Sequence, residues 1–143
     1  IGYPTTVVYA QDLSVPSILD GIRSGRVFID LTGSRDRLLD MRAESGGSSA
    51  EMGGALHAAK GASVALQVHV KACQDCTVEF FVDGKAAAAL QALPLSTPDA
   101  IIDTKWTSDG ARHWLRAEVH GSDHRLLLLG NPVYINWTAE KKQ

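Results

Sequence analysis

The sequence predicts a mainly β protein, an immunoglobulin-like antiparallel β-sandwich preceded by a short strand–helix–strand element. Two observations predict the sandwich. Residues 63–72, "SVALQVHVKA", alternate between apolar and polar side chains, and about seven such short runs are separated by turn signals roughly every dozen residues. A third observation predicts the front element, because the clearest helical pattern is confined to residues 14–25. At 143 residues, of which 45% are hydrophobic, the chain can build one core.

The front element is indicated by its helix signals. Ser14 stands at an N-cap position, Pro16 falls in the first turn, and Gly25 is placed to end the helix in a left-handed conformation. Residues 3–10 and 26–31 flank the helix as strands. One apolar stripe is expected on the helix, formed by Ile18, Leu19 and Ile22. This order is typical of an α/β protein, and three elements cannot bury their apolar faces alone.

The rest of the chain supplies the strands of the sandwich. In residues 63–72 the core side is expected to consist of Val64, Leu66, Val68 and Val70. Asp83-Gly84 is a strong hairpin signal, so the four alanines that follow are predicted as a strand rather than a helix. Residues 111–121 place Leu115, Ala117 and Val119 on one face. We therefore divide the chain into residues 1–33, the strand–helix–strand element, and residues 34–143, the sandwich.

Composition excludes several classes of function. Fourteen basic and sixteen acidic residues give a formal charge of −2, which argues against nucleic acid as a partner. No apolar run approaches the roughly 18 residues of a membrane span, and no secretory leader is recognisable. The chain begins at Ile1 rather than Met, so we expect it to be part of a longer protein. The compartment is left open.

The two cysteines form a C-x-x-C motif without the setting that redox or zinc chemistry needs. A zinc site requires further ligands at suitable spacing, and a thioredoxin-type site requires a helix start directly after a strand. Cys73 and Cys76 are instead flanked by predicted strands. We interpret them as facing each other across a Gln74-Asp75 turn, either reduced or joined in a small disulfide.

No catalytic, cofactor-binding or metal-binding residue is assigned from the sequence. The five histidines, in none of the usual ligand spacings, are His57, His69, His113, His120 and His124. Ser122-Asp123-His124 is interpreted as a turn, and no nucleophile elbow, dinucleotide fingerprint or P-loop occurs. The tryptophans, Trp106, Trp114 and Trp137, are expected in the core or at its edge, although they could also stack on a sugar.

The front segment, "PTTVVYAQDLSVPSILDGIRSGRVFI", resembles the end of the catalytic domain in the PHP (polymerase and histidinol phosphatase) superfamily. The branch it resembles is that of the predicted metal-dependent phosphoesterases, which includes the CehA/McbA-type hydrolases. The end of the chain, "WLRAEVHGSDHRLLLLGNPVYIN", is similar to the β-sandwich tail of these proteins. The resemblance implies a parent enzyme that hydrolyses its substrate at divalent metals such as Zn, Mn or Fe. The ligand motifs of the family lie upstream of the matched region, so none is carried onto this sequence.

The resemblance therefore predicts that residues 1–33 are the terminal strand–helix–strand element of an α/β catalytic domain. Residues 34–143 are then a non-catalytic C-terminal accessory domain that packs on or orients the catalytic domain of the same chain. This fragment itself is expected to hold no cofactor and to have no activity. A second hypothesis is a carbohydrate- or peptide-binding module that uses exposed tryptophans. A third is a structural dimerisation unit, in which the apolar face of the front helix buries against another copy.

Overall fold

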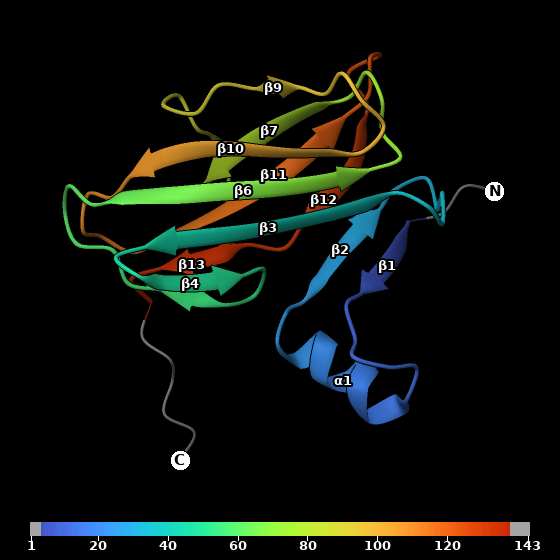
Figure 1. Ribbon diagram of the computed structural model, residues 1–143, viewed down its shortest axis with the longest axis horizontal. Coiled ribbons are helices and arrows are strands. Elements are labelled where there is room, and N and C mark those ends of the chain that lie inside the picture. The colour runs from blue at the N-terminus through green and yellow to red at the C-terminus, as the bar shows by residue number, and fades with distance from the viewer. Residues whose placement is uncertain (1–3, 138–143) are drawn as a thin grey trace.

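The structure is a computed structural model that describes residues 4–137. Two β-sheets lie face to face, and one short helix stands at the end of two neighbouring strands, outside the stack of sheets (Figure 1). The predicted mainly β class, with a sandwich and a single front helix in the described residues, is confirmed. The immunoglobulin-like subtype remains a prediction.

The smaller sheet has four strands in the order β10-β6-β3-β4, all antiparallel. Their bounds are β3 (Leu38–Ser45), β4 (Ser48–Glu51), β6 (Ser63–Lys71) and β10 (Ala100–Thr107). The strong alternation of β6 explains its central place, because the pleat sends its apolar side chains to the core and its polar ones to solvent. Val64, Val68 and Val70 are fully buried, as the sequence predicted.

The larger sheet is built around β11. Its main path is β1-β2-β12-β11-β13-β5, and β7, which also carries β8 and β9, pairs with the other side of β11. The bounds are β1 (Thr5–Val8), β2 (Val27–Asp30), β5 (Ala55–Leu56), β7 (Thr77–Val82), β8 (Lys85–Ala86), β9 (Leu93–Pro94), β11 (His113–His120), β12 (Leu126–Gly130) and β13 (Val133–Ile135). Only β13 and β5 pair in parallel among the described strands.

Strands β12 and β13 lie end to end along one side of β11. Leu128 pairs with Val119 near one end of β11, and Val133 pairs with Leu115 near the other. The interruption falls at Asn131 and Pro132, because proline has no N–H to donate to a ladder.

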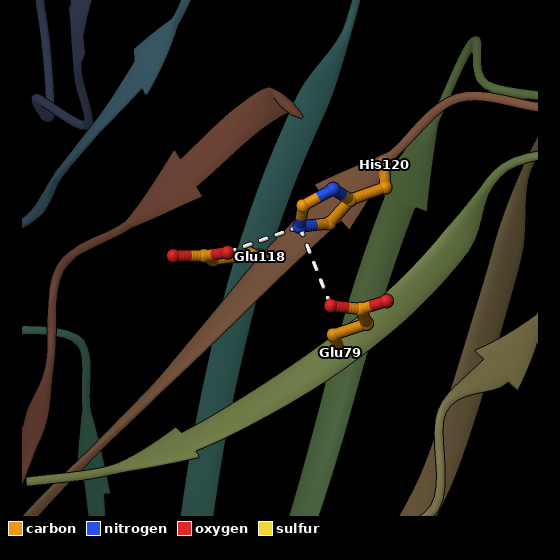
Figure 2. A group of neighbouring side chains, drawn as sticks. All are labelled: Glu79, Glu118 and His120. Atoms are coloured by element: carbon orange, nitrogen blue, oxygen red, sulfur yellow. Dashed lines mark hydrogen bonds and ion pairs between the residues drawn. The ribbon is translucent and has the colours of Figure 1, made fainter. Parts of the chain in front are cut away.

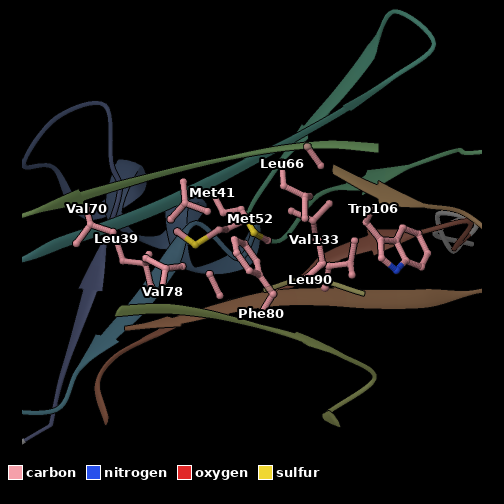
Figure 3. Close-up of a cluster of buried hydrophobic side chains, with 14 of the residues drawn as sticks. Leu39, Met41, Met52, Leu66, Val70, Val78, Phe80, Leu90, Trp106 and Val133 are labelled. Atoms are coloured by element: carbon pink, nitrogen blue, oxygen red, sulfur yellow. The ribbon is translucent and has the colours of Figure 1, made fainter. Parts of the chain in front are cut away.

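The core fills the space between the two sheets (Figure 3). Leu39 and Met41 of β3 meet Val78 and Phe80 of β7 in this layer, and all four are at most 3% exposed. The expected inward residues of β11 are also buried, namely Leu115, Ala117 and Val119. The sandwich thus has one continuous apolar core.

The front segment joins the larger sheet instead of forming a parallel α/β unit. Strands β1 and β2 pair with each other antiparallel, and β2 pairs antiparallel with β12. Phe28 of β2 is 1% exposed and belongs to the common core. The helix therefore connects two neighbouring antiparallel strands, whereas the helix of a βαβ unit crosses over between parallel ones. The division of the chain at residue 33 remains a prediction.

The alanine run differs from its prediction. Only Lys85 and Ala86 form strand β8, and the residues from Ala87 to Ala89 do not continue it. The hairpin turn itself is present, because Asp83 and Gly84 both have positive φ (52° and 82°), as the favoured two-residue turn requires. Without large side chains to pack, the alanines gain little from extending the pair.

Candidate functional site

Helix α1 (Val15–Arg23) begins and ends where the sequence predicted. The Ser14 hydroxyl accepts a hydrogen bond from the backbone N–H of Ser17, which satisfies one of the free donors of the first turn. At the other end Gly25 has a φ of 73°, a left-handed conformation that glycine adopts without steric cost. Local sequence therefore fixes the length of this helix.

The face of α1 that packs against the sandwich carries the smallest side chain of the helix. Gly21 is buried, and a β-carbon at this position would lie 2.5 Å from the carbonyl oxygen of Tyr9 and 2.7 Å from Cγ1 of Val8. The helix can approach β1 this closely only because residue 21 has no side chain. Its larger apolar residues are consequently on other faces.

These larger residues form an exposed apolar surface, which we call the α1 surface. Its members, with their exposed fractions, are Leu13 (99%), Val15 (70%), Leu19 (40%) and Ile22 (50%). The last three follow the i, i+4, i+7 spacing of one helical face. Of the predicted stripe, Leu19 and Ile22 belong to this surface, while Ile18 is partly buried. An unpartnered stripe of this kind on a well-anchored helix is typical of an interaction surface.

The C-terminal end of α1 is fastened to the sandwich by two loops. The amide Nδ2 of Asn131 donates to the carbonyl oxygen of Gly25 over 2.9 Å, and the N–H of Gly53 donates to the carbonyl of Pro132 over 2.7 Å. A β-carbon on Gly53 would lie 2.1 Å from the carbonyl oxygen of Ser24 and 2.5 Å from Cα of Gly25. The backbones of the helix end and of the turn after β4 are therefore in direct contact.

A charged cluster provides a second attachment. Arg26 binds both carboxylate oxygens of Asp40, at 2.8 and 3.2 Å, and its Nε lies 3.2 Å from Glu51. Its guanidinium also lies 4.6 Å from the centre of the Tyr9 ring, whose hydroxyl donates to the carbonyl of Leu39. Burial and the charge of Asp40 raise the pKa of Tyr9, so its hydroxyl stays protonated. A pocket of about 470 Å³ is lined by residues of this cluster and of α1.

The three tryptophans lie in different environments. Trp106 is 9% exposed and belongs to the core, with its ring edge against His113. Trp114 faces away from the core and pairs with Tyr134 of β13. Trp137 is 43% exposed, contacts the ring of Tyr134 edge-on and donates from Nε1 to the carbonyl of His113. Core packing is thus confirmed for Trp106, while Trp137 remains available to a ligand.

A cluster of Glu79, Glu118 and His120 lies on the outer face of the larger sheet (Figure 2). The Nε2 atom of His120 lies 3.0 Å from Oε2 of Glu118 and 3.5 Å from Oε2 of Glu79. Burial acts against a charge on His120, but the hydrogen bond to Glu118, the carbonyl of His124 and the charge of Glu79 raise its pKa overall. Sequence reasoning missed this group because it looked for paired histidines. The signal was a Glu-x-His pair on one face of a predicted strand.

A second histidine lies between two carboxylates at one end of the sandwich. Nδ1 of His113 lies 2.5 Å from Asp83, and Nε2 lies 2.9 Å from Asp109. Burial opposes a charge on this imidazole, but the hydrogen bonds and charges of Asp83 and Asp109 raise its pKa. Asp83 also accepts from the N–H of Trp114. His113 therefore joins the hairpin turn after β7 to the loop after β10.

The remaining sequence predictions concern turns. Cys73 and Cys76 form a disulfide across the Gln74-Asp75 turn, which settles the alternative that the sequence left open. Both cysteines are buried, at 2% and 4% exposure. Ser122 to His124 form the predicted turn, in which the His124 N–H donates to the carbonyl of Gly121.

Comparisons with known proteins yield no relative: no protein-family model, curated protein or solved structure matches the chain. Among the described residues no helix has the length and apolar character to cross a membrane. The class that the fold defines is a mainly β sandwich with an added helix.

Proposed function

We propose that this chain is the non-catalytic accessory β-sandwich of a PHP-type metal-dependent hydrolase, and that it packs on and orients the catalytic domain. The observation that carries the proposal is the α1 surface. Leu13, Val15, Leu19 and Ile22 are exposed on a helix whose end is held to the sandwich by Asn131, Gly53 and Arg26. An apolar surface on such a rigid base suits permanent docking, because little conformational entropy is lost on binding.

The placement of α1 supports its role as the docking surface. Gly21 lets the backbone of α1 lie against β1, so the helix keeps its position without burying Leu19 or Ile22. A partner that covers these side chains gains the transfer free energy of roughly 25 cal/mol per Å² of apolar area. The catalytic domain that the resemblance implies would be continuous with β1 and would lie beside this surface.

The direct test uses the chain and the upstream catalytic polypeptide of its parent as two separate proteins. We expect a complex by calorimetry, and the double variant L19D/I22D should weaken it at least about tenfold, which corresponds to about 1.4 kcal/mol. I101D is the matched control, because Ile101 is 61% exposed on β10, in the other sheet. Absence of a complex, or equal weakening by I101D, would contradict the proposal.

An activity assay supplies the second test. The isolated chain should not hydrolyse p-nitrophenyl phosphate or a carboxyl ester with added manganese or zinc. Hydrolytic activity that copurifies with the chain, and that is lost when the chain is denatured, would show that the fragment is itself an enzyme.

One observation favours a second candidate, the carbohydrate- or peptide-binding module. Trp137 is 43% exposed beside Tyr134, and the Arg112 guanidinium lies 5.5 Å from its ring centre. A module of this kind predicts that W137A abolishes retention on a glycan or peptide array. If the chain is a docking domain, neither the wild type nor W137A should be retained on the array.

The third hypothesis, a dimerisation unit, uses the same α1 surface with a second copy as its partner. Sedimentation velocity separates it from the docking proposal. A concentration-dependent dimer that L19D/I22D removes would support dimerisation, whereas a monomer at high concentration supports docking to another polypeptide.

A further inference from the structure

We propose that Glu79, Glu118 and His120 form a Zn²⁺ site on the outer face of the larger sheet. This site is independent of the α1 surface and of the function proposed above. It uses residues of two neighbouring strands, β7 and β11, and Figure 2 shows the three side chains converging on one point.

Strand register brings the three residues together. Glu118 and His120 are two residues apart on β11, so both point to the same side of the sheet. Glu79 of β7 lies directly opposite Glu118 in the antiparallel pairing. The arrangement therefore follows from the uninterrupted pairing of β7 with β11 and requires no loop to close.

The spacing of the donor atoms suits zinc. Zinc bonds of about 2.0–2.1 Å at tetrahedral angles separate two ligand atoms by about 3.3 Å. The distances from Nε2 of His120 are 3.0 Å to Glu118 and 3.5 Å to Glu79, and all three donor atoms lie within 4.8 Å of one another. A zinc ion can thus be bound by small side-chain movements alone.

Neighbouring groups orient two of the three ligands from outside the cluster. Nδ1 of His120 lies 3.2 Å from the carbonyl oxygen of His124, which can only accept, so Nδ1 keeps its proton and Nε2 is the nitrogen that gives up its proton to bind the metal. Arg116 donates to Oε1 of Glu118 over 2.7 Å, which leaves Oε2 turned toward His120. Partners of this kind fix ring orientation and ligand direction in protein metal sites.

Burial and charge also suit a dication. Glu118 is only 6% exposed, so its carboxylate is held in place, whereas the Glu79 side chain is 42% exposed and leaves a side open for water as a fourth ligand. With the imidazole neutral, as a zinc ligand must be, the two carboxylates and one arginine sum to −1, which attracts a divalent cation in place of the Nε2 proton. Imidazole with carboxylates favours Zn²⁺ over Mg²⁺ or Ca²⁺, which prefer oxygen ligands alone.

The test is calorimetric titration of the chelator-treated chain with Zn²⁺ near neutral pH. We expect one ion per chain, and Co²⁺ in its place should give the intense visible absorption of a four-coordinate site. H120Q and E79Q should each weaken binding at least about tenfold. H57Q is the matched control, because His57 is exposed and lies outside the cluster. Circular dichroism of each variant checks that it is folded.

Two results would overturn the site. One is the absence of Zn²⁺ binding by the folded wild-type chain at millimolar metal, which would leave the cluster as an ion-pair network only. The other is binding by folded H120Q and E79Q with wild-type affinity, which would place the ion on other side chains. Loss in both variants with unchanged binding by H57Q supports the proposal.

Discussion

The side-chain amide of Asn131 donates a 2.9 Å hydrogen bond to the carbonyl oxygen of Gly25, although 106 residues separate the two in the sequence. Pro132, the next residue, accepts a hydrogen bond from Gly53. The break between β12 and β13 therefore does more than interrupt a strand. It holds the end of α1 and the turn after β4 together, so that the α1 surface has a fixed position on the sandwich.

The contact between Gly53 and the end of α1 predicts a large effect of a single methyl group. G53A places a β-carbon 2.1 Å from the carbonyl of Ser24, in a residue whose φ is 86°. G47A is the matched control, because Gly47 has a φ of 80° but nothing within 4 Å of its added β-carbon. We expect G47A to cost about 1 kcal/mol from backbone strain alone, and G53A to cost at least about 2 kcal/mol more. Urea unfolding measures both, and equal losses would show that α1 does not dock here.

The Arg26 cluster predicts that a lysine at position 26, which keeps the charge, does not restore the full stability that the guanidinium gives. R26A leaves the partly buried carboxylate of Asp40 without its two hydrogen bonds, and should lower the free energy of unfolding by about 2 kcal/mol. R26K should lie in between, since lysine keeps the charge but cannot bind both oxygens at once. R23A is the control, because Arg23 is 72% exposed and should change stability by less than about 0.5 kcal/mol. Chemical denaturation measures the three variants, and equal free energies of unfolding for R26K and R26A would contradict the prediction.

The position of His113 between Asp83 and Asp109 predicts that stability depends on pH. Because the pKa of His113 is raised in the folded chain, its contribution is fully present below its ordinary value of about 6.5. That contribution is lost as the pH rises through the raised value. We therefore expect the urea midpoint of the wild type to fall from pH 6 to higher pH more steeply than that of H113Q. Because His120 titrates in both proteins, the difference between them isolates His113. An NMR titration that finds the His113 ring at or below its ordinary pKa would refute this prediction.

The carboxylates give the acid side of the same cluster. Hydrogen bonds from the N–H of Ala111 and from His113 lower the pKa of Asp109. Burial acts to raise the pKa of Asp83, but hydrogen bonds from His113 and Trp114 lower it overall. Their stabilisation is present above the ordinary carboxyl pKa and is lost as the pH falls through the lowered values. D109N should therefore remove part of the acid-induced loss of stability, which thermal denaturation between pH 5 and pH 2 can detect.

The disulfide predicts slow reduction of the folded protein. Both sulfur-bearing residues are buried, so a thiol reagent reaches them only after local opening of the turn. With reductant present, a thiol reagent should detect two thiols per chain in denaturant and much less than two in the native state. Because the bond closes a very short loop, with a sequence separation of 3, C73A/C76A should cost no more than about 2 kcal/mol from chain entropy. A chain that fails to fold without the bond would contradict this estimate.

The sequence by itself determined most of the elements, because their signals are local. Alternation sets which side of β6 and β11 faces the core, and Ser14 and Gly25 set the ends of α1. The same alternation pointed Glu118 and His120 outward. It did not show that Glu118 would be 6% exposed, since its cover comes from neighbours on the outer face of the sheet.

Tertiary structure decided the partners. The helix stripe was visible in the sequence, but only the approach of Gly21 to Tyr9 decides that Leu19 and Ile22 stay exposed. Glu79 lies 39 residues before Glu118, and the register of β7 on β11 alone makes them neighbours. Periodicity along a chain reports which way a side chain points, whereas strand pairing and helix docking decide what it meets. For that reason most of the long strands and the helix stripe could be predicted, whereas the exposure of that stripe and the Glu–Glu–His cluster could not.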